Sequence, residues 1–150
     1  MIKKAKKSNN RKQRYSLTRV WDLNKPKLLY ILYNPSVADE QIDDPTTRRL
    51  ISFTKKFDYG GFFVVNLFTE ISSNPKIINT TKGITNKNLK IIKKLSLIAD
   101  KVIYAWGANC DEPKIFKNLI FTPLCFGLNK NGSPKHPLYL KSDTQLKDYR

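Results

Sequence analysis

Three side chains that could bind or act on a ring stand at or beyond the ends of apolar stretches. Asn66 interrupts an apolar run at its carboxyl end, and its amide could read the edge of a polar ring or bond to loop backbone. Trp106 ends a later run and could stack on a base, although most such residues are core. His136, the only histidine, lies between Pro134 and Pro137. A neutral imidazole there could donate a hydrogen bond to a developing anion, whereas a lone histidine is a poor metal ligand.

Three carboxylates follow one another in a polar loop that begins at residue 34. Asp39, Asp43 and Asp44 could orient water, act as a base or bind a divalent cation. The alternative is structural: Asp44 would cap a helix whose first residue is Pro45, and the other two would form Asx turns. We favour the cap for Asp44 and leave both interpretations open for Asp39 and Asp43.

Apolar runs and turn residues predict the elements that must position these side chains. Strands are predicted over residues 15–21, 28–33, 62–68, 100–106 and 120–126, with helices over 45–57, 85–97 and 112–119. Alternating strands and helices are typical of a three-layer α/β/α domain with a short, mainly parallel sheet. Ligand sites in such sheets lie at the carboxyl ends of strands. We therefore expect the loops 34–46, 66–75, 107–112 and 128–139 to gather along one edge.

Charge is the most pronounced global property of the 150 residues. Lys and Arg number 28 against 12 Asp and Glu, which gives a net charge of +16 and favours nucleic acid as the partner. The alternative is that the amino-acid usage of an AT-rich genome inflates exposed lysine. Residues 1–13 are predicted to form a basic, flexible N-terminal arm, and residues 14–150 a single α/β domain.

The composition argues against a membrane partner and favours one cellular compartment. No apolar run approaches the roughly 20 residues that cross a bilayer, so we expect no membrane partner. Cys110 and Cys125 are too few for a disulfide scaffold, which makes the reducing cytoplasm the expected compartment.

Six groups of residues, in conserved order, together resemble one family of bacterial and phage proteins, the domain of unknown function 1643 family. The groups are Arg14-Tyr15-x-Leu17-x-Arg19-x-Trp21, Asn34-Pro35-Ser36-x-Ala38-Asp39, Asp43-Asp44-Pro45-Thr46, Val65-Asn66-Leu67-Phe68, Ala105-Trp106-Gly107 and His136-Pro137-Leu138-Tyr139. The resemblance extends from Arg14 to Leu140 and implies little about activity.

A second, weaker resemblance is to the uracil-DNA glycosylase superfamily. A buried strand followed by Asn34-Pro35-Ser36 looks like the strand and N-P-G motif of mismatch-specific members, Asn66 falls in a T-N-L-like position, and His136-Pro137 is similar to a late H-P-S loop. The resemblance implies a glycosylase-like α/β/α fold that needs no metal or other cofactor.

The same resemblance implies roles for named residues. Asn34 would position water, Asn66 would read an extruded base, His136 would stabilise the departing base, and Asp39 or Asp43 would steady the sugar or the water. Other residues of the base pocket would be Tyr33, Pro35, Ser36 and Trp106. Phosphate contacts would come from Arg11, Arg14, Arg19, Lys130 and Lys135.

The sequence thus predicts a nucleic-acid-binding protein, with DNA the expected partner, whose base pocket hydrolyses an N-glycosidic bond. One alternative is a metal-dependent phosphoesterase or nuclease that uses Asp39, Asp43 and Asp44. Another is a module that binds nucleotides or nucleic acid without catalysis.

Overall fold

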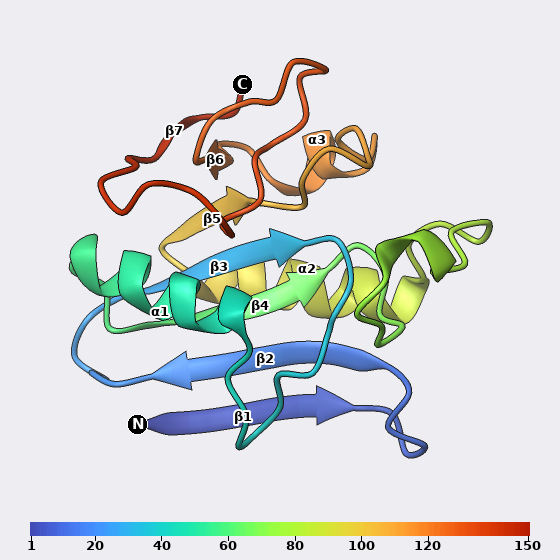
Figure 1. The fold of residues 1–150 in the computed structure, drawn as a ribbon, viewed down its shortest axis with the longest axis horizontal. Helices are drawn as coiled ribbons and strands as arrows, with labels where there is room; N and C mark the ends of the chain where they lie inside the picture. Colours follow the sequence, from blue (N-terminus) through green and yellow to red (C-terminus); the bar gives the residue numbers. More distant parts are fainter.

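A seven-stranded sheet runs through the protein in the order β1-β2-β4-β3-β5-β6-β7 (Figure 1). The computed structural model describes residues 1–150. The strands are β1 Ile2–Lys7, β2 Arg14–Val20, β3 Lys27–Leu32, β4 Gly61–Asn66, β5 Lys101–Tyr104, β6 Leu124–Cys125 and β7 Lys147–Asp148. The helices are α1 Pro45–Lys56, a 3₁₀ turn η1 Pro75–Ile77, α2 Asn86–Ile98 and α3 Phe116–Leu119.

The sheet is mixed, so the α/β class is confirmed but a mainly parallel sheet is wrong. Strands β4, β3, β5 and β6 are parallel, whereas β1, β2 and β7 each run antiparallel to their neighbours. The reversal between β1 and β2 takes place in a tight turn, where Arg11 has a φ of 58°. A turn this short joins antiparallel strands, because a parallel pair needs a long crossover.

The predicted flexible arm over residues 1–13 is instead mostly strand β1 and its turn. Ile2 pairs with Val20 and Ala5 with Leu17, which makes β1 an edge strand and moves β2 into the sheet. Alternate residues of β1 are half-buried, and Ala5 packs against the core. Backbone pairing with β2 orders this lysine-rich segment, although its side chains carry little apolar signal.

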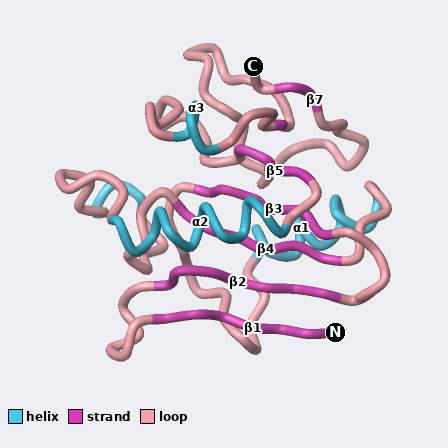
Figure 2. The backbone as a smooth tube through the Cα atoms, turned by 180° about the vertical axis from the view of Figure 1, so that it is seen from behind, coloured by secondary structure: helices cyan, strands magenta, loops and turns pink.

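Strand β3 is central because its apolar run is buried on both faces. Leu28 and Tyr30 join the core beneath α1, whereas Leu29 and Ile31 join the core beneath α2. Figure 1 shows α1 in front of the sheet, and Figure 2 shows α2 across its other face.

The C-terminal third is less regular than the sequence predicts. Of the strand expected over residues 120–126, only β6 forms, because Pro123 lacks a backbone N–H and Phe121 projects into solvent. No helix has the length and apolar character needed to span a membrane.

Candidate functional site

A cavity with a volume of about 600 Å³ opens where the central parallel strands end. The arrows of β3, β4 and β5 point to this edge in Figure 1. Four loops contribute to the lining, through residues within 33–37, 72–75, 107–109 and 136–138, together with the first turn of α1. The predicted gathering of loops at one edge is therefore present. A cavity of this size accommodates a small organic ligand.

Six of the predicted site residues line this cavity: Arg14, Tyr33, Asn34, Ser36, Trp106 and His136. Eight do not line it: Arg11, Arg19, Pro35, Asp39, Asp43, Asn66, Lys130 and Lys135. The cavity thus unites one amide, one imidazole and one guanidinium from distant parts of the chain.

Asn34 organises its own loop with one end of its amide. Its Nδ2 donates to the carbonyl oxygens of Pro35 at 3.0 Å and Ser72 at 2.8 Å, which ties the loop after β3 to the loop after β4. Its Oδ1 makes no hydrogen bond within the protein and is available to a water molecule or a ligand.

His136 lies in a loop that a backbone hydrogen bond fixes to the end of β5. Gly107 follows β5 with a φ of +86°, a conformation that favours glycine, and its N–H donates to the Pro134 carbonyl at 2.9 Å. This bond joins the end of β5 to the histidine loop. Burial lowers the pKa of His136, so that its imidazole is neutral near pH 7, and the nearby Asp44 carboxylate opposes this shift only in part.

Asp44 has two roles, of which the sequence favoured only one. The predicted cap is confirmed: Asp44 Oδ1 accepts the Thr47 N–H at 2.8 Å, and Pro45 is the first residue of α1. The same carboxylate lines the cavity, and Oδ2 makes no hydrogen bond within the protein. A helix cap at the carboxyl edge of the sheet faces the cavity. The available signal was therefore the position of Asp44 in the predicted loop 34–46, directly before the predicted helix 45–57.

Asn66 lies beneath the cavity instead of on its surface. It is fully buried, and its Oδ1 accepts a 3.4 Å hydrogen bond from Arg14 Nη2. Direct reading of a ligand by Asn66 therefore does not fit this structure. Its position supports Arg14, which does line the cavity.

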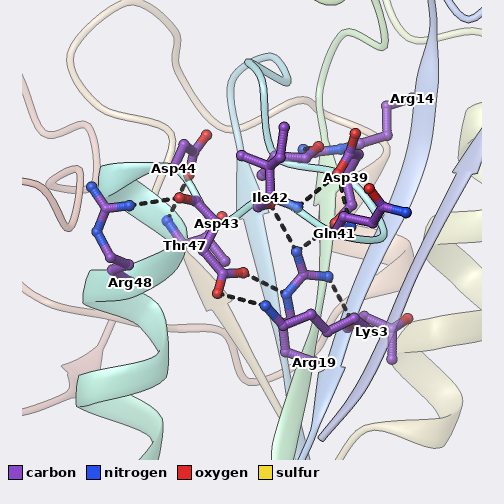
Figure 3. A network of polar contacts seen from close by, with 12 residues as sticks. Lys3, Arg14, Arg19, Asp39, Gln41, Ile42, Asp43, Asp44, Thr47 and Arg48 are labelled. Carbon is purple, nitrogen blue, oxygen red and sulfur yellow. Dashed lines mark hydrogen bonds and ion pairs between the residues drawn. The ribbon is translucent and has the colours of Figure 1, made fainter.

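Asp43 is occupied by a network at the α1 end of the sheet (Figure 3). Its two oxygens accept from Arg19 Nε at 2.7 Å and Lys3 Nζ at 3.0 Å. Partial burial favours the neutral carboxyl, but these two cations hold the pKa of Asp43 below its ordinary value. Arg19 is completely buried, so its predicted contact with phosphate is wrong.

Asp39 stabilises its own loop. Its Oδ1 accepts the N–H groups of Gln41 and Ile42, both at 2.8 Å, and these bonds lower its pKa. No cluster of three or more histidine, cysteine or acidic side chains that could hold a metal ion is present. The three-aspartate metal site of the phosphoesterase alternative is therefore not formed, because its members face different partners.

Trp106 is chiefly a core residue. Its ring lies 4.5 Å from that of Tyr104, centroid to centroid, and its Nε1 donates to the Cys110 carbonyl at 2.7 Å. Only 1% of the residue is exposed, so it contributes cavity wall and no free stacking face. Tyr33 is half-buried and its ring packs edge-on against Phe68.

Arg11, Lys130 and Lys135 remain exposed outside the cavity. Arg11 forms a 2.9 Å ion pair with Glu40, whereas the two lysines form none. All three are accessible to an external polyanion.

Comparison with known proteins identifies one family. No curated protein and no solved structure matches the chain. The family described as "Protein of unknown function (DUF1643)" matches residues 14–138, which include β2 to β6 and every element of the cavity. The chain therefore belongs to the DUF1643 family.

Proposed function

We propose that this protein binds nucleic acid, takes one base into the cavity and hydrolyses its N-glycosidic bond. The observation that carries the proposal is that Asn34, Asp44 and His136 line one cavity. Each offers an atom that the protein itself leaves free: an amide oxygen, a carboxylate oxygen and an imidazole nitrogen. Hydrolysis needs polar atoms that are available to water and substrate, whereas a purely structural role would leave these atoms bonded within the protein.

Each group has a distinct role in the proposed reaction. Asn34 Oδ1 accepts a hydrogen bond from a water molecule, and Asp44 Oδ2 accepts the proton that this water loses on attack. His136 Nε2–H donates to the base as negative charge develops on it. Asp44 therefore takes the place that the sequence assigned to Asp39 or Asp43.

The basic surface supplies affinity for the proposed partner. A net charge of +16 favours contact with phosphates, and such contacts offset the few kcal/mol needed to extrude a base. Binding is then expected to weaken steeply as salt rises.

A base-release assay tests the proposal. End-labelled single- and double-stranded oligonucleotides, each with one uracil or one modified base, are incubated with the protein and then cleaved with alkali at abasic sites. We expect cleavage at one class of base, undiminished by EDTA, and a rate lower by about 10²–10⁴ in Asp44→Asn. The matched control is Asp58→Asn, whose exposed carboxylate is remote from the cavity.

Two results contradict the proposal. Tight binding with no abasic sites across the panel would identify a non-catalytic binding module. Strand cleavage without alkali that EDTA abolishes would identify metal-dependent phosphodiester chemistry.

A further inference from the structure

Arg14 carries a buried charge that no carboxylate neutralises by direct contact. Only 3% of the residue is exposed, and no acidic oxygen lies within 4.0 Å of its nitrogens. Nη1 donates to the Ala38 carbonyl at 2.9 Å, and Nη2 makes a long bond of 3.4 Å to Asn66. Nε is buried and has no partner. A buried cation in this state favours an incoming anion.

Arg19 shows how the same fold treats a buried arginine that has only a structural role. Its Nε bonds to Asp43 at 2.7 Å, and its Nη2 donates to backbone carbonyls of the loop around Asp43 (Figure 3). Its Nη1 donates to the carbonyl of the preceding residue in β2. Arg19 does not line the cavity, whereas Arg14 does. Of these two buried arginines, the one without a carboxylate partner is therefore the one that borders the cavity.

The surroundings of Arg14 suit a flat, weakly hydrated anion. Leu17, Leu32, Leu50 and Val64 line the same cavity, so part of its wall is apolar. A phosphate is strongly hydrated and loses much hydration free energy when it moves against such a wall. An aromatic anion spreads its charge over a ring and loses less. A guanidinium is itself planar and weakly hydrated, and it stacks or forms paired hydrogen bonds with flat partners.

The other charged and titratable groups of the cavity do not cancel this preference. Asp44 is the acidic residue in the lining, and its charge is partly offset by the amino end of α1 that it caps. His136 is neutral near pH 7 and offers a donor. Donors from Arg14 and His136 can thus act on one bound anion.

We propose that Arg14 makes this cavity a binding site for a planar heterocyclic anion. The identity of that anion rests on the proposed function: it is the base as it leaves the sugar. Water adds to C1′ and gives its proton to Asp44, the C1′–N bond breaks, and the bonding electron pair stays on the ring. Arg14 then donates to the ring atoms on which the negative charge lies.

Binding of small rings tests this without requiring turnover. Calorimetric titrations at neutral pH compare barbiturate, a pyrimidine anion, with neutral uracil of nearly the same shape, and with inorganic phosphate. We expect the wild-type protein to bind barbiturate at least about tenfold more tightly than uracil, the ratio of one charge-assisted hydrogen bond. Phosphate is expected to bind more weakly than barbiturate.

Two substitutions assign the preference to Arg14. Arg14→Gln is expected to abolish the difference between barbiturate and uracil, and Arg14→Lys to restore part of it. Arg48→Gln removes the same charge from an exposed position outside the cavity, and it should leave the difference unchanged. The comparison of ligands on the wild-type protein remains decisive if Arg14→Gln does not fold.

The outcomes separate this inference from the proposed function. Equal affinity for the two rings, no binding of either at millimolar concentration, or tighter binding of phosphate would each overturn the anion site. A preference for barbiturate without release of any base would keep the anion site and remove the glycosylase proposal. Base release without that preference would do the reverse.

Discussion

The Nδ1 atom of His136 accepts a hydrogen bond of 3.1 Å from the backbone N–H of Leu138. A neutral imidazole carries one proton, so this bond places the proton on Nε2. The ring makes no other hydrogen bond within the protein. His136 is therefore prepared as a donor toward a ligand that gains negative charge, not as a base that removes a proton.

The depressed pKa of His136 predicts how stability changes with pH. In the unfolded chain its pKa returns to about 6.5, so below this pH the unfolded state binds a proton that the folded state does not. The free energy of unfolding is expected to fall as pH drops from about 6.5 through the lower folded pKa. Urea denaturation at several pH values measures this loss.

His136→Gln removes the titrating group and should flatten the curve in this pH range. The carboxylates with lowered pKa, Asp39, Glu40 and Asp43, act only at more acidic pH and do not interfere. An unchanged slope in the variant would show that another group causes the loss.

Asp44→Asn separates the two roles of this residue. Asparagine caps a helix about as well as aspartate, so the free energy of unfolding should change by less than about 0.5 kcal/mol. Loss of the carboxylate should nevertheless abolish most base release, because the proton acceptor is gone. Denaturation and kinetics on one sample test this, and Asp44→Ala, which loses cap and charge together, should also be about 1 kcal/mol less stable.

Asp43 is predicted to matter for stability and not for turnover. Asp43→Ala leaves Arg19 buried without its carboxylate, and such a loss costs about 3 kcal/mol. The rate per folded molecule should remain near that of the wild type, since Asp43 does not line the cavity. A large fall in that rate at full folding would restore Asp43 to the catalytic group.

The sequence was sufficient for elements whose signal is local. The apolar run at residues 28–33 predicts the central strand, and Asp44 followed by Pro45 predicts the start of α1. These signals depend on residues adjacent in the chain. The gathering of loops at the carboxyl edge was predicted from the same local signals, taken in order along the chain. Family membership follows from the same ordered motifs.

Other features depend on distant contacts that no local pattern reveals. Arg14 and Arg19 are alike in sequence, yet one lines a cavity and the other is enclosed by the loop around Asp43. The ring of Trp106 is taken up by Tyr104 and Cys110, which only the packing shows. Strand β1 is mostly lysine and has little apolar signal of its own, and pairing with β2 orders it.

Strand β1 leads to the last prediction, which separates its structural role from its charge. Deletion of residues 1–7 exposes the backbone edge of β2 and removes the Lys3–Asp43 ion pair and the contact of Ala5 with the core. We expect the free energy of unfolding to fall by on the order of 2 kcal/mol. The double variant Lys4→Gln, Lys6→Gln changes only exposed side chains and should unfold like the wild type.

If both lysines contact phosphates, the affinity of this double variant for DNA should be lower, and the slope of log affinity against log salt should be shallower by about 2. A variant with the wild-type slope would place the nucleic acid on another basic surface, and a deletion with wild-type stability would return residues 1–7 to the flexible arm that composition suggested.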